Sequence, residues 1–178
     1  MLSVSVGPKL STEQLIQQVA AIYAEKNIEI RREKGKEIFQ NRFDFEKFAQ
    51  LTLEDHWKHL KPAQRRAFLA VFKERFEERV LDYFKKEPAK FSVTVTKEGR
   101  FGNFRKVDCR WESNKKTGQF SLLWVLEEGK NGKVVDVWVS NASLVGNYQG
   151  QFNKIIRDHG FDEVLRRLKV SPEKFSAR

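Results

Sequence analysis

The stretch DVWVSNASLVGNYQGQF (residues 136–152) decides the fold, because a strand passes directly into a helix within it. The strand part is apolar on nearly both faces, whereas a strand with one face in water alternates apolar and polar residues. Ser143 is a good helix N-cap, and Gly146 and Gly150 follow inside the helix. This pattern predicts apolar material on each side of the last strand of a sheet.

The residues before this stretch predict three further strands. Phe91, Val93 and Val95 alternate with polar residues in the first of them, the next two lie near 103–113 and 120–128, and the strand of the opening stretch itself covers about 133–141. The connections between them are short and rich in Gly and Asn. Short connections favour an antiparallel meander of four strands.

Helices are predicted on both sides of this sheet in the sequence. The first is expected behind a capping box formed by Ser11 and Gln14, and the charge-rich stretch 26–42 is expected to be a helix broken at Gly35. The other predicted starts are Asp44, Pro62, Ser143 and Asp162, and the helix from Pro62 is expected to run to about Lys85, before Pro88. Helices, then a sheet, then helices predict an α+β fold.

Length and composition fit one soluble domain over residues 1–178. Hydrophobic residues make up 40% of the chain and charged residues 33%. The formal net charge of +10 predicts attraction to an anionic partner but does not choose between nucleic acid, a phospholipid surface and an acidic protein. Because no signal-peptide pattern precedes the helices, we expect either a cytoplasmic protein or a mature form that starts at a new methionine.

The residue types that usually carry catalysis or bind metals are sparse. His56 and His59 could share a helix face, but no third ligand has a compatible spacing, and Cys109 fits a packed strand position. No nucleotide-binding or hydrolase motif is present, and the basic residues are interleaved with acids, as on solvated helices. Asp136 in an apolar strand is either a general base or, as we favour, a structural hydrogen-bond acceptor.

The strands that are apolar on both faces leave two alternatives. Either the sheet is closed between helices and every ring belongs to the core, or the layers leave a cavity between them. A leucine that lines a cavity has the same sequence signature as one in a core, so the pattern does not choose.

Two sequence blocks resemble the MlaC family, also called the toluene-tolerance phospholipid-transport family. The resemblance covers about 43–169 and rests on Phe43-Asp44-Phe45, on Pro62-Ala63-Gln64-Arg65, on Asp136-Val137, and on Ser143-Leu144-Val145 with Asn147-Tyr148 and Gln151-Phe152. The chain departs from the family's usual residues at Gln149, where Arg is common, and at Gly132-Lys133, where Gly-Trp is common.

The resemblance implies a periplasmic phospholipid carrier that is not an enzyme. Its helices would wrap a strongly curved sheet, a cone like that of nuclear transport factor 2, and enclose acyl chains. Phospholipid would be cargo, with no cofactor, no metal and no nucleic acid. The implied partners are an inner-membrane ABC transporter with an MCE-domain protein and an outer-membrane lipoprotein complex, and the carrier is expected to be a monomer.

We predict the cavity lining from strand alternation and helix stripes. The sheet-side candidates are Phe91, Val93, Val95, Val107, Trp111, Leu122, Trp124, Val137 and Val139. The helix-side candidates are Phe72, Phe76, Val80, Leu144, Gly146, Tyr148 and Phe152, with Gly146 leaving space for a chain.

Two rival functions remain open at the level of the sequence. One is an enzyme on the same cone-shaped fold that acts on an apolar small molecule through Asp136. The other is a basic interaction module without a cavity, which predicts salt-dependent binding to nucleic acid.

Overall fold

The computed structural model describes residues 8–83, 91–113, 117–125 and 133–170. Its core element is a sheet in the order β1-β2-β3-β4-β5, in which every neighbouring pair is antiparallel. The strands are β1 (Phe91–Phe101), β2 (Phe104–Ser113), β3 (Thr117–Val125), β4 (Val134–Val139) and β5 (Ala142–Ser143). The predicted α+β fold with an antiparallel meander is therefore confirmed, with one strand more than expected.

The additional strand β5 comes from a tight hairpin at the end of β4. Ser140 and Asn141 both have positive φ angles, 49° and 67°, and Val139 pairs with Ala142 across them. Two consecutive positive φ angles are the signature of a two-residue hairpin turn that matches strand twist. The turn sends the chain back along β4 for two residues before α6 starts.

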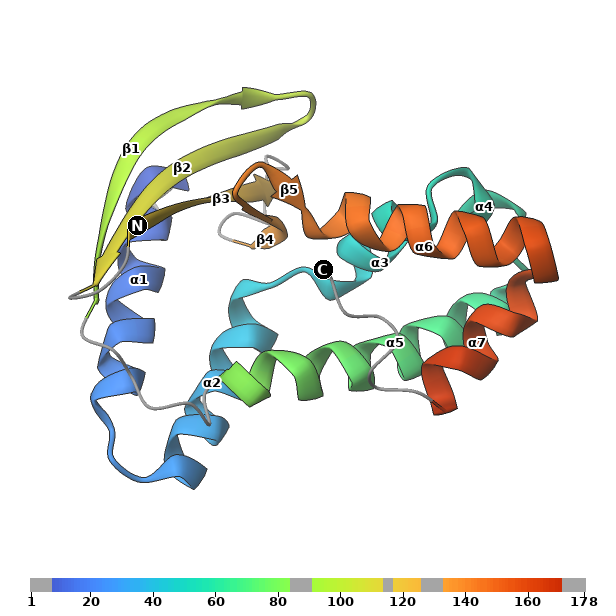
Figure 1. The fold of residues 1–178 in the computed structure, drawn as a ribbon, viewed down its shortest axis with the longest axis horizontal. Coiled ribbons are helices and arrows are strands. Elements are labelled where there is room, and N and C mark those ends of the chain that lie inside the picture. Colours follow the sequence, from blue (N-terminus) through green and yellow to red (C-terminus); the bar gives the residue numbers. More distant parts are fainter. Residues whose placement is uncertain (1–7, 84–90, 114–116, 126–132, 171–178) are drawn as a thin grey trace, which may run out of the picture.

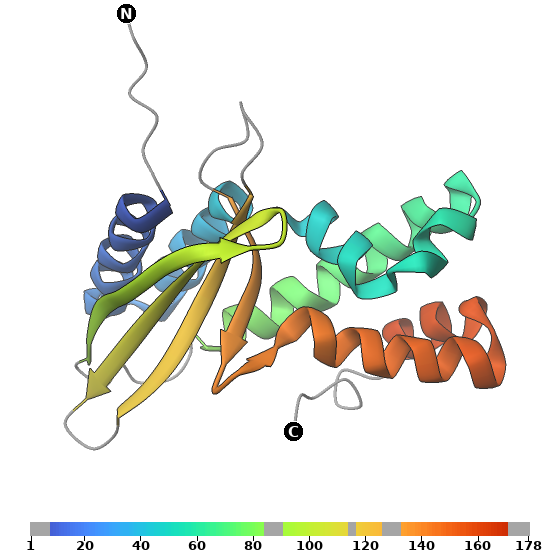
Figure 2. The same cartoon turned by 90° about the horizontal axis from the view of Figure 1, so that it is seen from above.

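In the part of the chain that the structure describes, helices lie at one face and at one edge of the sheet. They are α1 (Pro8–Ala24), α2 (Ile28–Arg42), α3 (Phe45–Leu53), α4 (Asp55–His59), α5 (Pro62–Tyr83), α6 (Leu144–His159) and α7 (Phe161–Val170). Figure 1 shows α1 beneath the curved strands β1 and β2. Figure 2 shows α6 and α7 beyond the edge formed by β4 and β5.

Most predicted helix starts are confirmed by their caps. The carboxylate of Asp44 accepts from the Lys47 amide at 3.0 Å, and the hydroxyl of Ser143 accepts from the Gly146 amide at 2.9 Å. Pro62 is the first residue of α5, where its missing N–H costs nothing. The expected end of α5 at Lys85 and Pro88 lies outside the described residues.

Two predictions about the first helices were wrong. Helix α1 begins at Pro8, so Ser11 lies inside it and does not cap it. Helix α2 continues through Gly35, which is buried, and Asn27 caps it by accepting from the Glu29 and Ile30 amides. A buried glycine in a helix is tolerated where a neighbouring element packs closely, because tertiary packing outweighs its low propensity.

Apolar side chains form two main clusters. Among the described residues, the helical cluster contains 14 buried ones from α2, α3, α5, α6 and α7, many of them aromatic. The sheet cluster contains Val107, Cys109, Leu122 and Val134, with half-buried residues from β1, β3, β4 and α1 around them. Phe43, between α2 and α3, packs against both.

We predict that Gly118→Ala destabilises the sheet. A Cβ atom at Gly118 would overlap the indole of Trp111, its partner across β2 and β3, so the ring has to move. Forcing a large side chain from its position costs about 1–3 kcal/mol. Thermal unfolding and near-ultraviolet circular dichroism measure the loss of stability and the altered indole environment.

Gly99→Ala is the matched control for this substitution. Gly99 is also a strand glycine, and a Cβ atom there meets nothing within 4 Å. Equal destabilisation by both substitutions would contradict the packing of Trp111 on Gly118.

Candidate functional site

The described sheet-side candidates all lie on one face of the sheet. Cross-strand partners share a face, and the register pairs Val93 with Trp111, Val107 with Leu122, and Leu122 with Val137. Val95 pairs with Cys109, Cys109 with Phe120, and Phe120 with Val139. Val95 and Val139 therefore lie on the same face. We call this the inner face.

The inner face is only partly covered. Val107 and Leu122 in its centre are buried, whereas Val93, Val95 and Val137 are half-buried and Val139 is 51% exposed. Leu15 and Ile16 of α1 and the ring of Phe43 pack against it. The result is an apolar surface whose rim still contacts solvent, which is suitable for an apolar ligand.

Two of the predicted lining residues lie outside this description. Phe91 and Trp124 belong to β1 and β3, but their side chains are outside the described part of the structure. Their assignment as lining stays a prediction.

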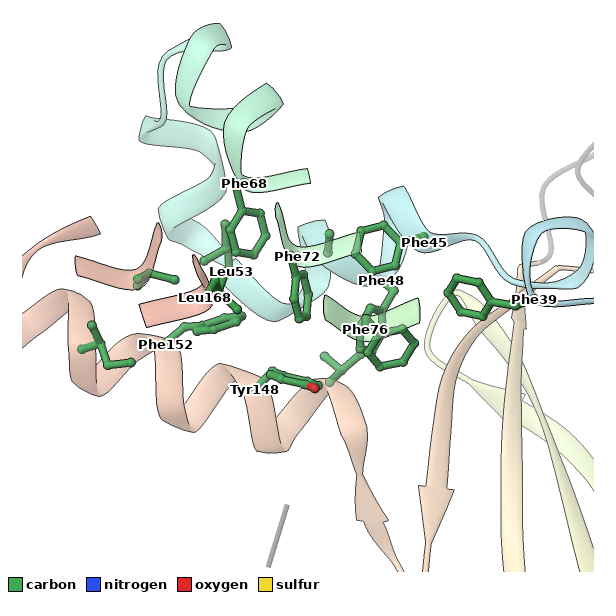
Figure 3. Close-up of a cluster of buried hydrophobic side chains, with 14 residues drawn as sticks. Phe39, Phe45, Phe48, Leu53, Phe68, Phe72, Phe76, Tyr148, Phe152 and Leu168 are labelled. Carbon is green, nitrogen blue, oxygen red and sulfur yellow. The ribbon is translucent and has the colours of Figure 1, made fainter. Parts of the chain in front are cut away.

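The helix-side candidates pack mainly against one another. Phe72 lies 5.0 Å from Tyr148 and 5.4 Å from Phe152 between ring centroids, and Phe76 lies 6.2 Å from Tyr148. Figure 3 shows these rings together inside the helical cluster. Val80 and Leu144 are half-buried at its margin. Such closely packed rings form a solid core, as expected for aromatic pairs at 4.5–7 Å.

The structure therefore places the two halves of the predicted lining in different clusters. Among the described residues, Phe43 is the side chain that packs against both the helical and the sheet cluster. Phe43 was not among the lining residues predicted from the sequence, although it directly precedes Asp44, a predicted helix start. Leu15 and Ile16, which pack on the inner face, were likewise not among the predicted lining residues.

Gly146 is exposed on α6 and away from the inner face. A Cβ atom there would contact only the side chain of Ser143, at 3.5 Å and beyond, and Gly150 has nothing within 4 Å. The amide of Gly146 takes part in the N-cap of α6. A role for Gly146 in leaving space for a ligand stays a prediction.

Asp136 holds the start of α6 to β4. Its carboxylate accepts from the Ser143 hydroxyl at 2.6 Å and from the Val137 and Val145 amides at 2.8 and 3.1 Å. The side chain is 3% exposed, and burial raises its pKa above the ordinary value, while the hydrogen bonds from Ser143, Val145 and Val137 oppose that rise. The two oxygens serve donors of the local backbone and cap, which is the arrangement of a structural acceptor.

Gln149, one of the departures from the resembled family, has a structural contact. Its side-chain amide donates to the carbonyl oxygen of Leu51 at 2.8 Å, which joins α6 to the end of α3. The position therefore fixes two helices of the helical cluster to each other.

Two pockets lie on opposite sides of α2. One, with a volume of about 460 Å³, is bounded by α2, α5 and the segment between α2 and α3, and the other, of about 650 Å³, lies between α1 and α2. Lys133, directly before β4, lines both. The sequence showed the many cations of α2 but not which of them share a pocket with Lys133, since that depends on how two distant segments pack.

The described residues contain no group of three or more His, Cys, Asp or Glu side chains that could hold a metal ion. Cys109 is buried, and burial together with the nearby Asp108 raises the pKa of its thiol to about 12. A thiol with such a high pKa is a poor nucleophile. In the described part of the chain, no helix is long and apolar enough to cross a membrane.

Comparisons with known proteins agree with this architecture. A family model described as MlaC protein matches residues 11–170. A solved structure of a phospholipid-binding protein from Ralstonia solanacearum, in complex with a phospholipid, is similar with a TM-score of 0.78. The match covers 97% of this chain and 100% of that chain at 16% sequence identity. No curated protein matches the sequence.

We predict that Asp136 makes stability depend on pH in a way that Asp136→Asn removes. Because the pKa of Asp136 is raised in the folded protein, the folded protein still holds a proton there at pH values where the unfolded chain has released it. The free energy of unfolding therefore falls as pH rises from about 4 to the raised pKa, by at most about 1.4 kcal/mol per pH unit. Urea unfolding of both proteins from pH 4 to 7 measures the difference.

Asp136→Ala is the companion variant, because it leaves the three donors without their acceptor. We expect it to cost about 2–4 kcal/mol at pH 7, more than Asp136→Asn. If the difference in free energy of unfolding between the wild type and Asp136→Asn stays constant over this pH range, burial does not raise the pKa of the Asp136 carboxyl group.

Proposed function

The chain belongs to the MlaC family, and from this membership we propose that it is a phospholipid-binding carrier whose inner sheet face holds acyl chains. The observation that carries the proposal is the register of the sheet, which gathers apolar side chains of four strands on one half-covered face. The similar Ralstonia solanacearum protein binds a phospholipid on the same fold. Both support a ligand with long apolar chains.

The energetics of an acyl chain suit a carrier. Each buried methylene contributes about 0.8 kcal/mol, so a chain of about 16 carbons approaches roughly 12 kcal/mol. Release into water would be very slow, and delivery needs a partner that opens or replaces the apolar surface. No step in this mechanism requires covalent chemistry.

The finer parts of the proposal follow from the family. We place the protein in the periplasm, between an inner-membrane ABC transporter with an MCE-domain protein and an outer-membrane lipoprotein complex. The protein acts as a monomeric single domain with phospholipid as its cargo. The three hydrogen bonds to Asp136 support this function over the enzyme, because they give the carboxylate a structural role.

We predict that Val95→Trp lowers phospholipid occupancy. Val95 is half-buried on the inner face, and an indole there would occupy space that the acyl chains need. Losing the contacts of two methylenes costs about 1.6 kcal/mol, which corresponds to an affinity loss of about ten-fold or more. Native mass spectrometry, with organic extraction and lipid analysis, measures the bound lipid.

Thr94→Trp is the matched control, because Thr94 is the preceding residue of β1 and lies exposed on the other face. Its lipid content should equal that of the wild type. If the wild-type protein carries no lipid and takes none from vesicles, the carrier proposal is wrong; if both variants retain lipid, the inner face is not the binding surface.

A further inference from the structure

The pocket between α1 and α2 combines an apolar floor with a cationic rim. Ile22 of α1 and Ile38 of α2 line it, and both belong to a small apolar cluster with Leu81 and Val80. Lys34 and Arg42 of α2 and Lys133 before β4 also line it. A surface of this kind is suited to an amphiphile with a negatively charged head.

The charge of this pocket is unbalanced. Against its three cations stands one carboxylate, that of Glu37. Among the residues that the structure describes, no carboxylate lies within ion-pair distance of Lys34, Arg42 or Lys133. These cations therefore have donors available for an anionic ligand.

The neighbouring pocket on the other side of α2 provides the contrast. It also contains Lys133, but there Lys133 and Lys73 are matched by the carboxylates of Asp44 and Glu46. Its formal charge is zero, so an anion gains less from entering it. Of these two pockets, the one between α1 and α2 has the excess of positive charge.

The cationic rim lies next to the inner face of the sheet. Arg42 precedes Phe43 and Lys133 precedes Val134, and these two apolar residues belong to the sheet cluster. A β-bridge joins Phe43 to Val134, and the Asp44 amide donates to the Val134 carbonyl at 2.8 Å. Backbone pairing thus fixes the two cations beside the surface that is proposed to hold the acyl chains.

We infer that Lys34, Arg42 and Lys133 bind the phosphate of the phospholipid head group while its chains lie on the inner face. The inference rests on the proposed carrier function and adds what the carrier recognises. A phosphate is costly to bury without partners, and charge-assisted hydrogen bonds from Lys and Arg are the strong way to satisfy it at a pocket mouth. The carrier therefore selects lipids that carry a phosphate over neutral lipids with the same chains.

The test compares two lipids with identical acyl chains, phosphatidylglycerol and diacylglycerol, both supplied in a neutral detergent. Native mass spectrometry titrations give the affinity of the wild type, of the double variant Lys34→Gln with Lys133→Gln, and of Arg42→Gln. We expect each variant to lose about 10- to 100-fold in affinity for phosphatidylglycerol. Affinity for diacylglycerol should stay within about two-fold, because no phosphate contact is involved.

Lys73→Gln is the matched control, because it removes the same charge from the balanced pocket next to Lys133. It should bind both lipids like the wild type. Thermal unfolding confirms that every variant is folded before its affinities are compared.

The outcomes separate the inference from the proposed function. A wild type that binds neither lipid overturns both. A double variant that keeps its affinity for phosphatidylglycerol, or loses both lipids equally, overturns the phosphate site and leaves the carrier function in place. If glycerol 3-phosphate binds the wild type as tightly as phosphatidylglycerol does, the site serves a soluble phosphate and its assignment to a lipid head group is wrong.

Discussion

Strand β4 is the constraint on which the rest of the structure depends, because three consecutive buried residues in it serve three different partners. Val134 belongs to the sheet cluster, and Val135 packs on the opposite side with Leu123. Asp136 accepts the donors that start α6. A register irregularity between Leu123 and Trp124, opposite Val134–Asp136, lets the strand satisfy all three. A strand that alternated strictly between apolar and polar residues could not pack an apolar side chain on each face of the sheet and also hold the start of a helix.

The junction explains why the apolar side chains divide into two clusters. Helix α6 starts at the far edge of the sheet and continues away from it, so its apolar stripe packs on α3, α5 and α7 (Figures 1 and 3). The inner face is left to α1, which contributes Leu15 and Ile16. Phe43 sits between the two, where the backbone of α2 passes to α3 beside Val134.

Much of this architecture could be predicted from the sequence because its signals are local. The caps at Asp44 and Ser143, Pro62 at the start of α5 and the alternation in β1 depend only on neighbouring residues, and the structure confirms each of them. Alternation also placed Val93, Val95 and Val137 on a common face. The start of α1 and the continuity of α2 through Gly35 were missed, because the helix begins earlier, at Pro8, and because the buried position of Gly35 outweighs its low helix propensity.

What the sequence could not reveal is which elements cover which face. The stripe of α5 reads the same whether Phe72 and Phe76 line a cavity or pack on Tyr148, since periodicity reports a shared face and not its partner. The same limit applies to Lys133 and Arg42, which are 91 positions apart and meet only because Phe43 pairs with Val134. Sites made from distant segments need the packing of the whole chain.

The division into clusters has a physical consequence for a carrier, which must stay folded both empty and loaded. If the ligand occupied the space between Phe72, Tyr148 and Phe152, its departure would leave a void in the core, and each large void costs several kcal/mol. The closely packed rings of the helical cluster instead supply stability that does not depend on cargo. The inner face, half-exposed at Val93, Val95 and Val137, contributes less to folding because its burial is incomplete. Under the proposed function, filling or emptying that face changes the hydration of an apolar surface while the core that maintains the fold stays packed.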